Sequence, residues 1–420
     1  MSSAYRQIRA SLRKATWSIR DKAAYKELLE NLAAFNTALE TSLPGQLQRF
    51  LESVLPATLS AADSNNELSD MVDLSTHHAF LTSQVRWVSA VQESEATFEG
   101  AQLQENHFER WDQVQSQSRY IVRRSAEQPK VYYLVDWGRW ESTHTDKQRN
   151  ISSVAGLLKN DTCDELRLLP CLGYLMEHDR RMETTRFALV YKSASAQPKF
   201  QSLLQLLSTF KTIQLPPLET RVALARTLCR AMMLYHSSGW IHHDFRSHNI
   251  LFMKADILSD TVTAGIEYQG MAFDRPYVVG FGHARGEDAL STMFMDSSAI
   301  AKTLKLQRLY WSPSYLSSSR ELQTNKSFLR SHDIYSLGCV FLEIGVWKPL
   351  EKYTWESTYD KDHRKWHERL LKEEGKLRAL CGSRYAEAVL QCLNWRSSDV
   401  ETDVQALAFS ILLKLEEITV

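Results

Sequence analysis

The sequence predicts an α+β protein, in which a helical N-terminal segment precedes a strand-rich region and a long helical region. Of the fifteen glycines, only Gly45 and Gly100 precede residue 118, and helix interiors disfavour glycine. Residues 120–191 contain runs of aromatic and β-branched side chains, which are typical of strands. After residue 199, apolar residues recur at helical spacing.

The first 118 residues are predicted to form a helical segment. Residues 21–39 have apolar side chains at helical spacing, with Asp21 placed to cap the start, and Pro44 ends the pattern. Residues 47–55 form a shorter amphipathic stretch, and residues 67–98 form one or two further helices. Because such helices cannot bury their apolar stripes alone, we expect a small bundle, by itself or packed on the next domain.

The second domain is predicted to cover residues 119–420, because residues 100–118 are polar and rich in glutamine. Strands are expected at residues 120–122, 131–137, 168–174 and 187–191, with a short helix at residues 151–158. Helices are expected at residues 201–210, 218–237, 331–347 and 361–374, and two more before residue 420.

The overall composition excludes several classes of protein. Fifty basic residues balance fifty acidic ones, so no global field favours nucleic acid, and no such partner is expected. No apolar stretch reaches the roughly 18 residues of a membrane-spanning helix, and the basic start lacks the apolar core of a signal peptide. The six cysteines form no C-x-x-C pair, which is typical of reduced thiols in a cytoplasmic protein.

The most informative stretch covers residues 236–252 and reads HSSGWIHHDFRSHNILF. Asp244 precedes Asn249 by five residues on a loop between a predicted helix and an apolar run. Side chains at this spacing can point into one cleft. Phosphoryl transfer to a hydroxyl needs a carboxylate that orients the hydroxyl and an oxygen that binds a metal ion on the nucleotide.

Four motifs in this order resemble the protein-kinase family over residues 120–420. Residues 242–249 match H-R-D-x-x-x-x-N, residues 276–282 are a strand ending in Gly-Phe-Gly, and residues 310–315 resemble the end of an activation segment. Residues 331–345 match the D-x-[YW]-S-x-G helix, which small-molecule kinases lack. The resemblance implies a protein-kinase-like bilobal fold with a small β-rich lobe and a large helical lobe.

The resemblance also implies roles for particular residues. Asp244 would be the catalytic base, and Arg246 would replace a lysine near the γ-phosphate, although a guanidinium is not equivalent to an ammonium group. Asn249 would bind the metal ion of an ATP–Mg²⁺ cofactor, or it would only brace the loop. The position of the cofactor-binding D-F-G turn is taken by Gly280, Phe281 and Gly282.

The loop histidines and one aspartate are expected to be structural. His243 replaces the arginine that reads a phosphorylated activation segment, so such phosphorylation is not expected to control the protein. His242 and His248 are predicted to pack inside the loop, because no carboxylate or cysteine cluster accompanies them. The family resemblance implies that Asp333 braces the loop backbone.

Three motifs that bind the nucleotide phosphates or their magnesium ion in protein kinases are missing from the sequence. Gly280 stands where the magnesium-binding aspartate belongs, no G-x-G-x-x-G precedes the loop, and the strand-lysine position reads Gly138. Because phosphoryl transfer depends on positioning and charge neutralisation, we expect catalysis to be impaired. The weak substitutes for the lysine and its glutamate partner are Lys130, Lys147 and Glu165.

Residues 17–22 read WSIRDK, and residues 25–32 continue as YKELLENL. With the kinase-like half behind it, this segment resembles fungal proteins that join a HeLo-type helical domain to a kinase-like domain, and its helices resemble only the later part of such a helical domain. The alternative is an ordinary amphipathic helix without family meaning. In that family the helical part is linked to prion propagation and heterokaryon incompatibility. The mixed-lineage kinase-domain-like pseudokinase has an analogous architecture, in which a helical bundle damages membranes.

Three functions follow as hypotheses. The first is a pseudokinase signalling module that binds a protein partner and controls the N-terminal helices. The second is an active, atypical ATP-dependent Ser/Thr protein kinase that uses Asp244, Arg246 and Asn249. The third is a membrane-active helical protein whose kinase-like half is only a scaffold.

Overall fold

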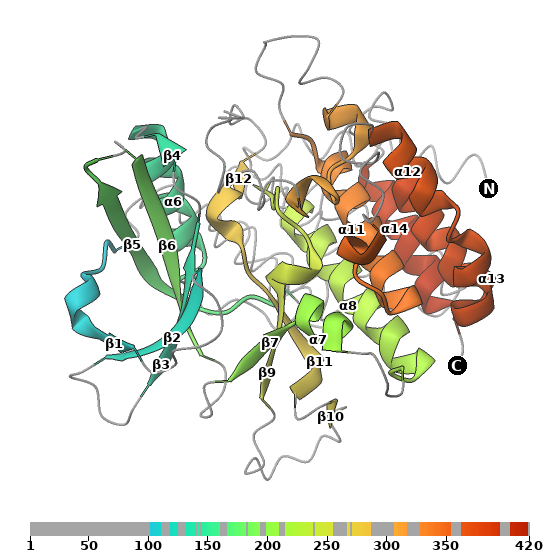
Figure 1. Ribbon diagram of the computed structural model, residues 1–420, viewed down its shortest axis with the longest axis horizontal. Coiled ribbons are helices and arrows are strands. Elements are labelled where there is room, and N and C mark those ends of the chain that lie inside the picture. Colours follow the sequence, from blue (N-terminus) through green and yellow to red (C-terminus); the bar gives the residue numbers. More distant parts are fainter. Residues whose placement is uncertain are drawn as a thin grey trace, which may run out of the picture.

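The computed structural model describes residues 101–110, 118–124, 131–138, 141–142, 145–159, 166–181, 184–193, 199–209, 215–237, 240–254, 267–268, 271–286, 306–316, 328–353, 363–394 and 404–418. In this part of the chain, a sheet with one helix packed on it is followed by a mainly helical region, so the protein is α+β (Figure 1). The helices predicted before residue 100 lie outside the described residues.

The first region is built on a six-stranded antiparallel sheet. Its strands follow the order β1-β2-β3-β6-β4, and β5 also pairs with β6. The strands are β1 (Phe108–Arg110), β2 (Arg119–Arg124), β3 (Tyr132–Trp137), β4 (Glu141–Ser142), β5 (Cys171–Asp179) and β6 (Thr184–Lys192).

Helix α6 (Thr145–Leu157) packs on one face of this sheet, beside β5 and β6 (Figure 1). Alternate strand residues point to this face, so Ile121 and Leu134 join Val154 of the helix in one buried core. The opposite face is also apolar, because Val122 and Val135 belong to a second buried cluster. Apolar residues on both faces explain why these strands read as nearly continuous apolar runs.

The second region combines helices with two small sheets. The four-stranded sheet has the order β10-β11-β9-β7, and the two-stranded sheet joins β12 to β8. The strands are β7 (Phe200–Ser202), β8 (Trp240–Ile241), β9 (Ile250–Lys254), β10 (Glu267–Tyr268), β11 (Met271–Val278) and β12 (Arg285–Gly286). The helices are α7 (Leu203–Thr209), α8 (Leu218–Ser237), α11 (Arg330–Val346), α12 (His363–Leu371), α13 (Glu374–Asn394) and α14 (Val404–Glu416).

Helix α11 lies at the centre of this region, packed against α8 and α13. Every residue from Ser331 to Val346 is buried, so polar side chains on this helix need partners inside the protein. A Cβ atom on Gly338 would come 2.5 Å from the Cβ of Cys392, and one on Gly345 would come 2.6 Å from a side-chain carbon of Leu377. The two glycines therefore allow α13 to approach closely.

The predicted elements agree with the structure in most places. The helix predicted at residues 218–237 is α8, with the same ends, and the strand predicted at residues 131–137 is β3. The strand predicted at residues 168–174 differs, because β5 begins at Cys171 and runs to Asp179 by pairing with β6. Residues 101–110 join the sheet through β1 and a bridge between Gln102 and Tyr174.

The cysteines in the described part of the chain lie in the core. Five of the six cysteines are described, and all five are buried and free. Burial raises the pKa of the Cys171 and Cys229 thiols to about 12, so neither is a reactive thiolate near neutral pH.

Candidate functional site

The loop of residues 242–249 connects β8 to β9, and α11 holds its backbone. Asp333 accepts hydrogen bonds from the backbone N–H groups of His242 at 2.7 Å and His243 at 3.0 Å. His236 of α8 lies 3.3 Å from the same carboxylate. Burial raises the pKa of Asp333, but the hydrogen bond and charge of His236 and the hydrogen bond from the backbone of His242 outweigh it, and the net pKa is lowered from 3.8. Asp333 therefore braces the loop as an ionised carboxylate.

Asp244 is buried and surrounded by donors. Its Oδ1 accepts a hydrogen bond of 2.5 Å from Nε2 of Gln307, and Nε of Arg246 lies 2.9 Å from the same oxygen. Its Oδ2 accepts a hydrogen bond of 3.0 Å from Nδ2 of Asn249. The structure thus brings three predicted site residues together, and it adds Gln307, which a substrate hydroxyl would have to displace from Asp244.

Both polar atoms of the Asn249 side chain are also hydrogen-bonded. Its Nδ2 donates to the backbone carbonyl of Asp244 at 2.7 Å, and its Oδ1 accepts a hydrogen bond of 2.6 Å from Nη2 of Arg119 on β2. Nε of Arg119 lies 2.6 Å from Oδ1 of Asp136 on β3. The oxygen that the kinase resemblance assigns to a metal ion is therefore bonded to a guanidinium group.

The Gly280 turn packs directly against Asn249. Gly280 has φ +89°, which residues other than glycine rarely adopt, and a Cβ atom there would lie 2.3 Å from Nδ2 of Asn249. Its N–H donates a hydrogen bond of 3.0 Å to Oδ2 of Asp136. A carboxylate thus reaches the Gly280 position from the sheet, but the same carboxylate is paired with Arg119.

These contacts determine whether the site can hold a magnesium–nucleotide complex. Asn249 and Asp136 offer oxygens of the correct type, but both are bonded to Arg119. Among the described residues, no group of three His, Cys, Asp or Glu side chains is arranged to hold a metal ion. The arrangement therefore does not fit Mg²⁺ unless Arg119 leaves.

The rings of His242 and Phe281 pack against each other behind the loop at a tilt of 56°, with ring centres 4.5 Å apart. Burial lowers the pKa of His242. Its Nδ1 accepts a hydrogen bond from the N–H of Asp244, so its Nε2 donates to the carbonyl of Val279. The ring is neutral and packed, as the sequence predicts for this histidine. His248 is half-buried, and loss of solvent around its ring lowers its pKa well below 6.5.

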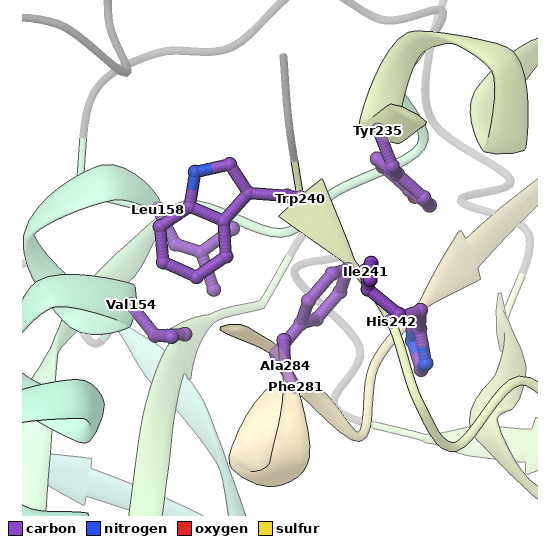
Figure 2. Close-up of a pocket in the computed structure, with 8 residues that line it drawn as sticks. All are labelled: Val154, Leu158, Tyr235, Trp240, Ile241, His242, Phe281 and Ala284. Atoms are coloured by element: carbon purple, nitrogen blue, oxygen red, sulfur yellow. The ribbon is translucent and has the colours of Figure 1, made fainter. Parts of the chain in front are cut away.

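A small apolar pocket lies between this pair of rings and α6. Figure 2 shows Trp240 lying beside Val154 of α6 and Leu158, which follows the helix, with Phe281 and His242 on the other side. The free volume is about 10 Å³, roughly the least that one water molecule needs. The pocket is a packing gap with no room for a nucleotide.

His243 lies among aromatic side chains of the segments that follow the Gly280 turn. The ring centres of Phe328, Tyr315 and Trp311 lie 4.2, 6.2 and 6.3 Å from that of His243. The residue has φ +68°. His243 thus packs against this region by its ring, where the family resemblance places a charged arginine.

A second buried network ties the loop to α11. Tyr310 donates a hydrogen bond of 2.8 Å to Oε1 of Glu343, and its hydroxyl lies 2.9 Å from that of Ser247 in the loop. The N–H of Leu350 donates to the same Glu343 oxygen at 2.7 Å. Burial raises the pKa of Glu343 from 4.5 to about 8, and these hydrogen bonds offset only part of that effect. Glu343 is therefore largely protonated at neutral pH.

The Glu343→Gln variant is expected to have a flatter dependence of unfolding free energy on pH. In the wild type, the contribution of the proton on Glu343 is complete below pH 4.5 and is lost as the pH rises through about 8. The maximal slope is about −1.4 kcal/mol per pH unit. Glutamine carries no such proton, so the variant should gain stability relative to wild type as pH rises. Urea unfolding across this pH range measures it, and the control Glu374→Gln, in an exposed ion pair, should retain the slope.

The site contains residues that sequence reasoning missed. Arg119, Asp136 and Gln307 carry its main contacts, yet none matches a kinase motif. One signal for Asp136 was available, because it is a charged residue in the apolar strand YYLVDW. A charge in such a strand is expected to be buried and therefore to have a partner. Lys130 and Glu165 lie outside the described residues, as does the side chain of Lys147.

Comparison with known proteins bears on the N-terminal segment. Residues 1–74 match the HeLo family, described as prion-inhibition and propagation, and no kinase family matches the chain. No curated protein matches it. A HeLo domain indicates a fungal signalling protein of the prion and incompatibility type. Among the described residues, no helix is long and apolar enough to cross a membrane.

Proposed function

We propose that residues 119–420 form a catalytically silent protein-kinase-like module. In this proposal, the module binds a protein partner and controls an N-terminal HeLo-type segment in fungal incompatibility or cell-death signalling. The arrangement of a sheet with α6, a loop at residues 242–249 and a buried α11 supports the kinase-like fold. The match of residues 1–74 to the HeLo family supports the signalling role.

The turn at Gly280 is the observation that carries this proposal. A metal-binding carboxylate at this position would need a Cβ atom, and that atom would lie 2.3 Å from Asn249. The packing of Asn249 against residue 280 therefore leaves no room for an aspartate side chain. Asp244 is held by Gln307 and Arg246, so the retained catalytic-type residue serves the internal structure of the loop.

Adding ATP with Mg²⁺ is expected to leave the melting temperature of the wild-type protein unchanged. A ligand at 100 times its Kd would stabilise the folded state by about 2.7 kcal/mol, which thermal unfolding detects easily. The Asp244→Ala variant should show the same lack of response. Metal-dependent autophosphorylation that disappears in Asp244→Ala would contradict the proposal.

An active atypical protein kinase is the second candidate, and one contact favours it. Oδ2 of Asp136 lies 3.0 Å from the backbone nitrogen of Gly280, close to the position of the missing aspartate. Catalysis by this route would require Arg119 to release Asp136 and Asn249. A melting-temperature rise with ATP and Mg²⁺ that is lost in Asp136→Asn would support this candidate.

The HeLo match also supports an effector role for the N-terminal segment. We extend the proposal to a membrane or protein target for this segment and to a cytoplasmic location for the chain. Leakage of anionic vesicles caused by the full chain, and lost when residues 1–74 are deleted, would support a membrane target. Inert behaviour of both chains would favour a protein target.

A further inference from the structure

Residues 101–110 form a strap that joins the two outer edges of the six-stranded sheet. At one end, the N–H of Leu103 donates a hydrogen bond of 2.8 Å to the carbonyl of Tyr174 on β5, and the N–H of Tyr174 donates one of 3.1 Å to the carbonyl of Ala101. At the other end, β1 pairs with the outer edge of β2. The strap, cyan in Figure 1, therefore runs from the β5 edge of the sheet to its β2 edge.

The strap covers part of the apolar cluster on the face of the sheet opposite α6. Leu103 and Phe108 pack against this cluster, which contains Val135. The ring of Phe108 meets that of Tyr133 at 77°, with ring centres 6.0 Å apart. The other residues of the strap are exposed. Its contribution to the core is therefore two apolar side chains on an extended segment.

Gly173 of β5 leaves room for the strap. A Cβ atom at this position would lie 2.2 Å from the carbonyl oxygen of Ala101 and 3.1 Å from Cγ of Leu103, and the residue has φ +156°. Glycine within a strand is typical of places where another backbone approaches closely. A side chain at this position would push the strap away, whereas β5 would still pair with β6 on its other side. The outer edge of β5 is thus suited to a strand at close range.

The strap is held less firmly than the strands that it joins. Its Glu109 pairs with Arg123, but these side chains are 49% and 31% exposed, so the pair contributes little to stability. Segments with few buried apolar contacts and exposed backbone hydrogen bonds open at a low free energy, before the rest of the domain unfolds. We therefore expect the strap to open locally while β2, β3 and β6 stay paired.

We propose that the strap occupies a strand-binding site, and that an extended segment of the protein partner takes its place there. The site consists of the β5 edge beside Gly173 and the part of the apolar cluster that Leu103 and Phe108 cover. The partner segment pairs in parallel with β5, as the strap does, and supplies two apolar side chains to the cluster.

Displacement of the strap would reach the N-terminal segment, because the strap follows that segment directly in the chain. When the strap leaves β5, residue 101 is no longer attached to the sheet. Binding of the partner and release of this attachment are then coupled, and the coupling acts equally in both directions. The inference deepens the proposed function, on which it rests for the partner and for the control of the N-terminal segment.

The test uses a fluorescent synthetic peptide with the sequence of residues 101–110 as the competing strand, and fluorescence anisotropy measures its binding to the full chain. The double variant Leu103→Ser, Phe108→Ser should open the strap without changing β5. This variant should bind the peptide roughly tenfold more tightly than the wild type, because its own strap no longer competes. Adding Gly173→Ala should abolish binding, since the new Cβ would meet the peptide backbone as it would meet Ala101.

Gln104→Ser, Asn106→Ser is the matched control in the same strap. Both side chains are exposed, so this variant should bind the peptide no better than the wild type does. A peptide with serine in place of its leucine and phenylalanine should bind neither variant. Hydrogen exchange checks that the strap of the first double variant is open. An open strap without peptide binding, or binding that persists after Gly173→Ala is added, would overturn the proposal.

Hydrogen exchange of the wild type decides the matter if the first double variant does not fold. Excess peptide should speed the exchange of residues 101–110 and leave that of β3 and β6 unchanged, and an unaltered exchange of the strap would overturn the proposal. These readouts involve no nucleotide. Metal-dependent autophosphorylation would therefore contradict the proposed function without changing them.

Discussion

Replacing Asp333 by alanine is expected to destabilise the protein by roughly 3–5 kcal/mol. The carboxylate is fully buried and accepts the backbone N–H groups of His242 and His243. Each buried donor left without a partner costs about 1–3 kcal/mol, and the loop at residues 242–249 loses its two hydrogen bonds to the start of α11. Such a loss is a large part of the 5–15 kcal/mol that typically stabilises a domain. The midpoint of urea unfolding measures the change.

The matched control is Asp274→Ala on β11. Asp274 is partly exposed and lies 3.9 Å from the exposed Arg275, so its loss should change the unfolding free energy by no more than about 0.5 kcal/mol. Asp333→Asn should fall between wild type and Asp333→Ala, because one acceptor oxygen remains. Equal midpoints for the Asp333→Ala and Asp274→Ala variants would refute the role of Asp333 as a brace.

Restoring the family aspartate with Gly280→Asp is expected to lower stability by about 3 kcal/mol and to produce no kinase activity. Strain at a positive φ costs about 1–3 kcal/mol, and overpacking against Asn249 costs a similar amount. Because the new Cβ would lie 2.3 Å from the Asn249 amide, the side chain that holds both Asp244 and Arg119 must move. Unfolding midpoints and phosphate transfer from labelled ATP with Mg²⁺ measure the two effects.

Gly282→Ala in the same Gly-Phe-Gly turn is the control for this variant. A Cβ atom at Gly282 would meet no atom within 4 Å, so alanine should be tolerated within about 0.5 kcal/mol. If Gly280→Asp were as stable as wild type and transferred phosphate in the presence of Mg²⁺, the site would be one substitution away from activity. In that case the packing of Asn249 would not explain the missing aspartate.

Much of the fold in the described part of the chain follows from local signals. Helix α8 has the predicted ends because residues 218–237 combine helical apolar spacing with a stop signal at their end. Strand β3 was detectable from its aromatic and β-branched residues. The sequence did not reveal β5 beyond Tyr174, because residues 175–179 read LMEHD and owe their strand conformation to pairing with β6.

The candidate site was likewise predictable from the sequence only in part. The spacing of Asp244 and Asn249 within one loop was sufficient to place them together, and hydrogen bonds join them. Arg119 reaches that loop from more than one hundred positions earlier in the chain, and Asp136 holds it there. No local pattern encodes such a contact, so sequence reasoning could detect only that a charged residue lies in an apolar strand.

The sequence by itself determined that the chain has an α+β order of elements, a loop with Asp244 and Asn249, and a glycine where a metal-binding aspartate is expected. Only the tertiary structure decided what fills the space around Asn249. The register of β2 and β3 brings Arg119 opposite Asp136, and the approach of the sheet to the loop places the guanidinium on Asn249. The physical reason is that buried charges are paired by long-range packing, which a linear pattern of residues does not contain.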